Sequence, residues 1–469
     1  TTSTPTEPVA NLEINDYIWK GLNLYYYWQE EVNELANSKT TNAAEYNTFL
    51  GSVEDPSDFF YSLNHEDDRF SWIEENYVDL QNQLAGISAS NGMKFYVTRQ
   101  CQNCNELVAV VTYVLPESDA AAKGIERGNL IISINGLDLR VGNYVELLYG
   151  DLMTYTVGLA SYNQDTQIFE STGESVVLDK VENFQENPIH KNIILEAGDR
   201  SVGYLMYNQF VASFDDQLIQ VFSDFASQNI TDLVLDLRYN GGGSVRTCAY
   251  LASMITGQFT DEIFAQQLWN SKLMDYFNNL NNNSDPDDDR ELNNYFTNAT
   301  VDGASLPGLN LSTVYILTTK KSASASELLI NGLAPHINVV QIGETTVGKN
   351  VGSISIYDYI DNNGTKNPDH TYAMQPIVLK IANSEGFADY SDGLVPNTAL
   401  NEYASDLGVL GDPTENFLAA ALNQISDSER YSIIPKGTSF PLMKDPTFEA
   451  KHGMHIDFPQ EKYIDILKN

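Results

Sequence analysis

The sequence predicts a multidomain chain of mixed α+β and α/β class, with a helical N-terminal region, a β-rich domain and an α/β core. The chain has 469 residues, which is more than one average domain contains. Its apolar content of 42% is normal for a globular protein that buries a core. From Ser201 onward, strand-like, helical and glycine-rich segments alternate, and this order is typical of a parallel sheet covered by helices.

The predicted α/β core begins with a strand over residues 201–210 and a helix over residues 215–225, where apolar side chains recur at helical spacing. The continuous apolar run Leu233–Leu237 is typical of a strand buried in a parallel sheet. It leads into the glycine-rich loop Arg238–Ser244 and then a helix that ends near Ile255. The loop lacks the spacing of a phosphate-binding P-loop, so its glycines favour close approach of the backbone to a reacting carbonyl group.

A second junction between a strand and a helix carries small residues. The apolar run Thr313–Thr318 predicts a strand, Lys321–Glu327 reads Lys-Ser-Ala-Ser-Ala-Ser-Glu, and Leu328–Leu333 has helical spacing. The first turn of a helix leaves backbone N–H groups unpaired. A serine at such a turn, for example Ser324, would have an exposed hydroxyl beside an N–H that can bind an oxyanion.

A serine nucleophile needs a base, and the next strand-and-glycine segment supplies a candidate. That segment, Gly343–Lys349, ends in a lysine. The residues alone leave an alternative open, in which Ser322 or Ser324 caps the helix and Lys349 is an ordinary surface lysine. For the catalytic interpretation, burial must keep the lysine neutral, because the acidic chain favours its protonated form.

The formal net charge of −38 argues against nucleic acid, anionic membrane surfaces and polyanionic substrates as partners. No apolar run approaches the roughly 18 residues of a membrane span. The polar start Thr1–Pro8 predicts a tether or the end of a processed leader. The acidity and this start favour a location outside the cytoplasm.

No metal or cofactor site is expected. Cys101 and Cys104 form a C-x-x-C pair, but no second pair completes a zinc site. Two alternatives remain for this pair: a local disulfide in an oxidising compartment, or two reduced thiols. Asp361–Gly364 does not fit a calcium loop, because Tyr359 and His370 would occupy positions one and twelve, so we expect a hairpin turn.

Three other segments are assigned by composition and spacing. Residues 11–85 predict helices whose aromatic side chains, including those of Trp72–Tyr77, form a core, with a break at Asp55–Phe60. The Asn- and Asp-rich residues 278–296 predict a solvated insertion. Residues 407–425 predict a further helix.

The β-rich domain is predicted from residues 88–180. Strands are expected at 92–97 and 107–114, and a short helix with a glycine stop at 116–124. Residues 125–136 alternate into a strand and end in an Asn-Gly turn.

One sequence pattern in this region ends at Gly136 and reads Gly-Ile-x-x-Gly-Asn-x-Ile-x-x-Ile-Asn-Gly. This pattern resembles a PDZ domain. Such domains bind an extended peptide C-terminus as an added strand and hold its carboxylate with backbone amides. The resemblance implies that Met93, Lys94 and Phe95 form the carboxylate-binding loop. The alternative is a PDZ-like domain that only packs against the rest of the chain.

Four signals occur together in one order: the PDZ-like domain, the loop Asp236–Gly243, the serine run of Ser322–Glu327 and the glycine-lysine pair at Lys349. In this combination the chain resembles a C-terminal processing, or tail-specific, serine peptidase of family S41, over roughly residues 88–425. The resemblance implies a ClpP/crotonase-like catalytic core.

It also implies the site residues. Ser324 would be the nucleophile, Lys349 the general base, and the N–H groups of Ala325 and Gly242 the oxyanion hole. One position departs from the family pattern, since many members carry Gln or Glu four residues after the lysine and this chain carries Ser353. A serine hydroxyl can orient an amine but reaches less far, so an orienting group elsewhere is an open alternative.

We therefore predict a tether and helical region over 1–87, a PDZ-like domain over 88–185, a peptidase core over 186–430 and a C-terminal extension over 431–469. The expected partners are proteins or peptides with flexible C-termini, and the oligomeric state is left open. The expected location is the bacterial periplasm, or the outer membrane or cell surface as an anchored lipoprotein. Two alternatives are a binding protein of the same fold that does not cleave, and an adaptor that works through its PDZ-like domain.

Overall fold

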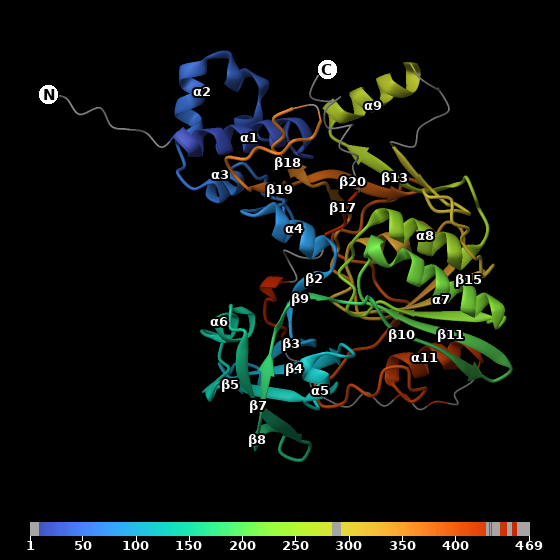
Figure 1. Cartoon of the computed structure of the whole chain (residues 1–469). Coiled ribbons are helices and arrows are strands. Elements are labelled where there is room, and N and C mark those ends of the chain that lie inside the picture. The colour runs from blue at the N-terminus through green and yellow to red at the C-terminus, as the bar shows by residue number, and fades with distance from the viewer. Residues whose placement is uncertain are drawn as a thin grey trace.

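The computed structural model describes residues 9–283, 292–361, 363–427, 431, 433, 441–447 and 453–456, the side chains of 9–11 and 280–283 excepted. Figure 1 shows a helical N-terminal part at the top left, a mixed α/β core at the right and a β-rich unit at the lower left. The predicted class of a multidomain, mixed α/β chain is confirmed. No helix in the described part of the chain is both long and apolar enough to cross a membrane.

The N-terminal part buries its aromatic side chains as expected. Tyr17, Trp19 and Tyr26 are at most 7% exposed. Asp55 caps the third helix by accepting a hydrogen bond from the Asp58 N–H, so the predicted break is the start of a helix. The helices of this part are α1 (Val9–Tyr25), α2 (Ala43–Leu50), α3 (Pro56–Ser62), α4 (Tyr77–Leu84) and the 3-10 helices Asn33–Leu35 and Asn37–Thr41.

The helical prediction for Trp72–Tyr77 is wrong. Its first half is strand β1 (Trp72–Glu74), which pairs antiparallel with β19 (Ala373–Gln375), itself paired with β18 (Ile356–Tyr357). These three residues form a strand because they pair with β19, in which Gln375 lies opposite Trp72. The two partners are about 300 positions apart in the sequence. Local spacing in the sequence carries no signal of such a pairing.

The core contains a six-stranded sheet in which strands 10, 11, 12, 15, 16 and 21 are neighbours in that order. The first pair is antiparallel and the other pairs are parallel. The strands are β10 (Ile189–Ala197), β11 (Arg200–Tyr207), β12 (Asp232–Asp236), β15 (Thr313–Thr318), β16 (Asn338–Gly343) and β21 (Thr398–Ala399).

Helices cover both faces of this sheet. Three of them share one hydrophobic core with the N-terminal helices, and the fourth packs on the other face in a separate core. The first three helices are α7 (Asp215–Ser227), α8 (Val245–Thr256) and α10 (Ala325–Leu333), with the 3-10 helix Ala212–Phe214, and the fourth is α11 (Asn416–Ile425).

A second sheet of four strands packs against α10 from the side opposite the first sheet. Helix α10 therefore lies between two sheets, and every residue of it is buried. The sheet consists of β14 (Asn293–Tyr295), β13 (Ile263–Trp269), β20 (Ile377–Asn383) and β17 (Val351–Ser353), and α9 (Ser271–Asn283) follows β13.

The β-rich unit is a separate sheet with its own core. Its strand β3 lies at one edge, and β2 pairs with β9 where the chain enters and leaves the unit. The elements are β2 (Ile87–Ser90), β3 (Met93–Arg99), β4 (Leu107–Val114), α5 (Asp119–Ala122), β5 (Leu130–Ile134), β6 (Leu137–Asp138), α6 (Tyr144–Tyr149), β7 (Thr154–Asn163), β8 (Ile168–Asp179) and β9 (Val181–Gln185).

Several smaller expectations are settled by the structure. The predicted helix over 407–425 starts only at Asn416, because Gly408 and Gly411 have φ of +66° and +78° and break the helical path. Cys101 and Cys104 are free thiols. Tyr359 pairs antiparallel with Lys366, as the hairpin requires. The acidic run of the predicted 278–296 insertion lies outside the described residues.

Candidate active site

The junction between β15 and α10 positions Ser324. Because β12 and β15 are parallel neighbours, the loops that follow them meet at one edge of the sheet. Ser324 is the residue that precedes α10, with φ of +63° and ψ of −113°. A conformation of this kind costs a non-glycine residue about 1–3 kcal/mol and is typical of functional turns. The Ser324 hydroxyl is buried and has no hydrogen-bond partner among the described residues.

The glycine loop after β12 lies directly against this serine. A side chain on Gly242, whose φ is +111°, would place its Cβ 2.7 Å from Ser324 Cβ and 2.9 Å from the backbone nitrogen of Ala325. Only glycine permits this approach. The structure thus brings Gly242, Ser324 and Ala325 together, as the sequence predicts.

The two predicted oxyanion-hole amides differ in their surroundings. Ala325 occupies the first position of α10, where the backbone N–H has no acceptor within the helix. The Gly242 N–H donates to Asn240 Oδ1 at 2.8 Å. That amide is therefore already engaged, and it would be available to an oxyanion only after the Asn240 side chain moves away.

One buried carboxylate connects the serine loop with the lysine loop. Glu327 Oε2 accepts hydrogen bonds from the Ser324 N–H at 2.7 Å and from the Lys349 N–H at 2.8 Å. Its Oε1 accepts from the Gly348 N–H at 2.6 Å and from the Thr346 hydroxyl. Burial raises the pKa of Glu327, and these hydrogen bonds oppose that shift.

Sequence reasoning included Glu327 only as the last residue of the serine run. The signal that could have found its role is the spacing, because a Glu three residues after a helix-capping Ser accepts the N–H of the cap. Its hydrogen bonds with the Gly348 and Lys349 backbone depend on how the fold brings the two loops together, so sequence spacing does not predict them.

Lys349 is the predicted base, and its side chain is only 3% exposed. Burial lowers the pKa of Lys349 to about 8, while Asp68 and Glu327 raise it and Arg69 lowers it. The ammonium nitrogen lies 4.6 Å from the centre of the Phe70 ring. A buried amine with this pKa is partly neutral near pH 8.

The N-terminal part supplies contacts that sequence reasoning missed. The Arg69 guanidinium donates to the carbonyl oxygens of Gly348 at 3.0 Å and Ser391 at 3.2 Å. Asp68 Oδ1 in turn accepts from the Phe70 N–H at 2.9 Å. The segment from Asp68 to Phe70 therefore holds the lysine loop and covers the amine.

Ser353 lies in β17. Its hydroxyl accepts from Gln375 Nε2 at 3.1 Å and donates to the carbonyl oxygen of Met454 at 3.0 Å. Among the described residues these are its two hydrogen-bond partners, and the Lys349 amine is not one of them. The predicted orienting role of Ser353 therefore has no hydrogen bond to support it and stays a prediction.

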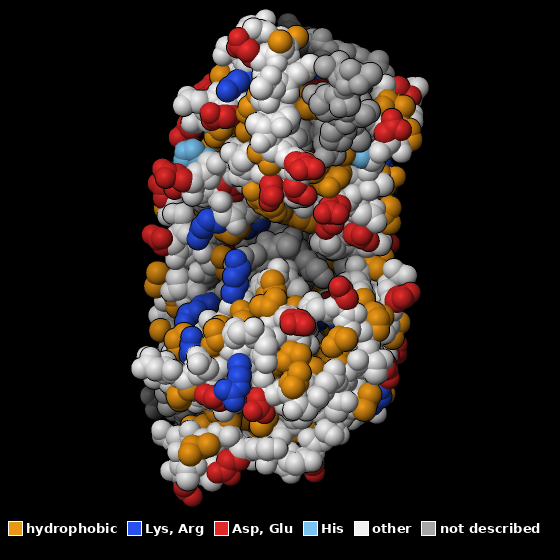
Figure 2. Space-filling model, turned by 90° about the vertical axis from the view of Figure 1, so that its left-hand side faces the viewer, with side chains coloured by type: hydrophobic (Ala, Val, Ile, Leu, Met, Phe, Trp, Pro, Cys, Tyr) orange, Lys and Arg blue, Asp and Glu red, His pale blue; other side chains and the backbone are white. Residues whose placement is uncertain are grey.

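The residues predicted to form a carboxylate-binding loop are not a loop, because they are the first three residues of strand β3. Met93, Lys94 and Phe95 line a cavity of about 240 Å³ between the β-rich unit and the core. Lys94 forms an ion pair with Glu186. From the core side, Lys321 Nζ donates to the Phe95 carbonyl oxygen at 3.1 Å. Figure 2 shows that the face of the molecule seen there is hollowed at mid-height, with Lys and Arg side chains along one side.

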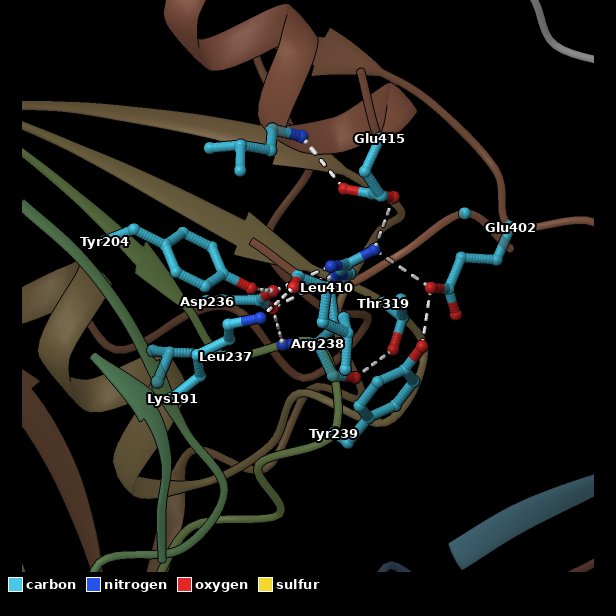
Figure 3. Close-up of polar contacts among 12 residues, drawn as sticks. Lys191, Tyr204, Asp236, Leu237, Arg238, Tyr239, Thr319, Glu402, Leu410 and Glu415 are labelled. Atoms are coloured by element: carbon cyan, nitrogen blue, oxygen red, sulfur yellow. Dashed lines mark hydrogen bonds and ion pairs between the residues drawn. The ribbon is translucent and has the colours of Figure 1, made fainter. Parts of the chain in front are cut away.

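A buried ionic network fixes the base of the glycine loop (Figure 3). The fully buried Arg238 guanidinium pairs with Asp236 at 2.7 Å, Glu415 at 2.9 Å and Glu402 at 3.0 Å. Glu402 also pairs with Arg127 of the β-rich unit at 2.8 Å. The network therefore joins the strand that carries the glycine loop to the neighbouring unit.

Replacing Glu327 with glutamine tests whether its carboxylate positions the site. The amide of Glu327→Gln offers one oxygen where the carboxylate offers two, so either the Gly348 N–H or both the Ser324 and Lys349 N–H groups lose their acceptor. We expect kcat for a peptide substrate to fall about 100-fold with little change in KM, since a displacement of about 1 Å has an effect of that size. Steady-state kinetics measures this change. The exposed Glu385→Gln is the matched control, and equal kinetics of both variants would contradict the positioning role.

Comparison with known proteins supports one family. Residues 201–372 match the model of peptidase family S41, and residues 13–72 match the model of the peptidase S41 N-terminal domain. The two matches occur in chain order and include the serine loop, the lysine loop and the N-terminal contacts with the lysine.

Individual relatives agree with these matches. A carboxyl-terminal-processing protease of Picosynechococcus is 23% identical over 371 residues, which are 78% of this chain and 77% of the relative. The chloroplastic carboxyl-terminal-processing peptidase 1 of Arabidopsis thaliana is 24% identical over 260 residues, or 53% of this chain and 45% of the relative. A crystal structure of a Bacteroides fragilis protein assigned to the S41 proteases superposes with a TM-score of 0.66 at 25% identity, covering 91% of this chain and 99% of that one.

The fold is also similar to that of a photosystem II D1 C-terminal processing protease, with a TM-score of 0.50 at 16% identity, over 90% of this chain and 99% of that one. The family matches and these relatives identify the chain as a serine-type peptidase, a hydrolase that acts on peptide bonds. Its residues 201–372 form a domain of peptidase family S41, and its residues 13–72 form the N-terminal domain of that family.

Proposed function

We propose that the protein cleaves polypeptides near flexible C-termini with a catalytic dyad of Ser324 and Lys349. The observation that carries this proposal is the Glu327 carboxylate, which accepts the backbone N–H groups of both residues. Two backbone segments bound to the same oxygen atom are held next to each other. The buried, uncommitted hydroxyl and the buried amine are the two groups that such a dyad needs.

In the proposed reaction, neutral Lys349 removes the proton from the Ser324 hydroxyl as its oxygen attacks the scissile carbonyl carbon. The Ala325 N–H binds the oxyanion of the tetrahedral intermediate, and a donor of this kind contributes about 2.7–4 kcal/mol in other enzymes. Gly242 would be a second donor after Asn240 releases it. Protonated Lys349 then donates its proton to the leaving amine, and water hydrolyses the acyl-enzyme.

The β-rich unit is proposed to act as a PDZ-like module that captures the substrate. Its edge strand β3 can accept an added strand, and Met93, Lys94 and Phe95 line the cavity at its start. The position of that cavity between the unit and the core supports delivery of a bound chain toward Ser324. The four-part domain division, the ClpP/crotonase-like core and a location outside the cytoplasm stay predictions.

The direct test is cleavage of an unfolded reporter protein with an apolar C-terminus, followed by mass spectrometry of the products between pH 6 and about 10. We expect cleavage whose rate rises with pH through about 8 and then reaches a plateau, because only the neutral lysine acts as base. No cleavage at any pH, together with retained binding of the reporter, would instead support the alternative of a binding protein.

The charge of Asp68 gives a prediction with a defined sign. Asp68 raises the pKa of Lys349, so Asp68→Asn should lower that pKa further and increase the neutral fraction below pH 8. We expect the pH–rate profile to move to lower pH and the rate at pH 7 to rise about twofold. Asparagine keeps the oxygen that accepts the Phe70 N–H.

The matched control is Asp67→Asn, which removes the same charge from the chain. The Asp67 carboxylate is 77% exposed. Its profile should stay at the position of the unsubstituted protein. A shift of the Asp68→Asn profile to higher pH would show that the carboxylate does not act on the lysine as described.

A further inference from the structure

Two segments near the C-terminal end of the described chain, residues 441–447 and 453–456, lie against groups that the proposed function assigns to substrate binding and catalysis. These groups are the edge of β3 and Lys349. We propose that these pieces form an internal pseudosubstrate, which occupies the edge of β3 and the surroundings of Lys349 and competes with protein substrates. The inference deepens the proposed function, since it names the mode of substrate binding and its regulation, and it rests on that function.

The first piece adds a strand to the edge of the β-rich unit. Leu442 forms an antiparallel bridge with Thr98 of β3, and the Met443 N–H donates to the Val97 carbonyl oxygen at 2.8 Å. The Thr98 hydroxyl donates to the Pro441 carbonyl oxygen at 3.2 Å. An extended peptide binds to an exposed sheet edge by hydrogen bonds of this kind.

The same piece contacts the helix that faces β3. The Met443 side chain packs against the core of the unit, which includes Leu148 of α6. The Tyr144 hydroxyl, also from α6, donates to the Lys444 carbonyl oxygen at 2.9 Å. Residues 441–444 therefore lie where the β3 edge and α6 come together.

A carboxylate lies at the end of this added strand. Because the pairing is antiparallel, the piece runs toward the start of β3, where Met93, Lys94 and Phe95 lie. The Asp445 carboxylate pairs at 3.3 Å with Lys321 Nζ, and this amine also donates to the Phe95 carbonyl oxygen. Asp445 therefore stands in for the terminal carboxylate of a bound substrate.

The second piece forms a strand between the glycine loop and β17. The His455 N–H donates to the Gly243 carbonyl oxygen at 3.2 Å, and the His455 carbonyl oxygen accepts from the Val245 N–H at 3.1 Å. On its other side, the Met454 carbonyl oxygen accepts from the Ser353 N–H at 2.8 Å. The backbone thus uses the hydrogen-bonding groups of both flanking segments.

This strand also covers the base. A side chain on Gly453 would place its Cβ 3.2 Å from Lys349 Nζ and 3.7 Å from Ser353 Oγ, so the Gly453 backbone lies against both groups. Met454 is fully buried in the main core. A substrate strand that needs the same backbone groups has to displace this piece.

A segment tethered to the site competes at an effective concentration in the millimolar range, so free substrate is at a disadvantage until the segment leaves. A chain truncated after Ile433 should therefore cleave the reporter with kcat/KM at least about tenfold higher than the full chain. A synthetic peptide of residues 441–456, added in trans, should inhibit the truncated chain competitively.

A point variant keeps the test independent of truncation. His455→Pro removes the N–H that donates to Gly243, whereas His455→Ala keeps it. We expect activation by His455→Pro and near-unchanged kcat/KM for His455→Ala. If neither the truncated chain nor His455→Pro is more active than the full chain, while circular dichroism shows both folded, the inference is overturned.

Failure of the proposed function gives a different result. In that case no form of the chain cleaves the reporter, and the inference is decided by binding alone. A fluorescent peptide of residues 441–456 should then bind the truncated chain carrying Ser324→Ala and not the full-length chain with the same substitution. Equal binding by the two chains, or none by either, would overturn the inference.

Discussion

Cleavage of the unfolded reporter should fall by at least about 10⁴-fold when Ser324 is replaced with alanine, and by a similar factor in Lys349→Ala. In the proposed mechanism, the first change removes the nucleophilic oxygen and the second removes the base that takes its proton. Because the two groups act as a unit, the double variant should be no slower than either single variant. Initial rates measured at saturating reporter, with intact folding shown by circular dichroism, give these factors.

The pH dependence separates the two roles. Burial lowers the pKa of Lys349 to about 8, so the unsubstituted protein should gain activity through that pH, and residual activity in Lys349→Ala should lack this rise. Lys320→Ala is the matched control, because the Lys320 side chain is 59% exposed. Full activity of Lys349→Ala with an unchanged profile would assign the base to another group.

The largest effect on stability is expected at Arg238. In Arg238→Met the carboxylates of Asp236, Glu402 and Glu415 lose a fully buried cation. Leaving a buried charge without its partner costs about 3–5 kcal/mol of the free energy of unfolding. Urea unfolding followed by tryptophan fluorescence should show a lower midpoint for the variant.

An exposed arginine provides the comparison. Arg140 is 50% exposed and pairs with Glu106, which is 44% exposed. Arg140→Met should therefore lower the free energy of unfolding by less than about 1 kcal/mol. Equal midpoints for the two variants would mean that the buried network adds no more stability than a surface ion pair.

Local patterns predicted the elements that carry Ser324 and Lys349. The strand Thr313–Thr318 is found with its predicted bounds. A short apolar run between polar residues predicts a buried strand and also marks where the strand begins and ends. The same holds for Leu107–Val114. The placement of Ser324 beside Gly242 was implied by the resemblance to family S41, and the structure gives its reason, since loops after neighbouring parallel strands meet at one edge.

What local patterns could not predict depends on pairings between distant residues. Phe70 lies over the Lys349 amine although the two are far apart in the sequence, and Gln375 reaches Ser353 from another strand. The hydrogen bond from the Gly242 N–H to Asn240 depends on one side-chain rotamer. Such contacts follow from the packing of complete elements, and no spacing rule encodes them.

The position of Glu327 has a consequence for precision. The distance between two loops usually depends on the positions of all the strands and helices that connect them. Here the serine and lysine backbones are registered to one oxygen atom, at 2.7 Å and 2.8 Å. A shift of one loop is therefore passed to the other through this carboxylate, and the relative position of the two backbones depends on two hydrogen bonds.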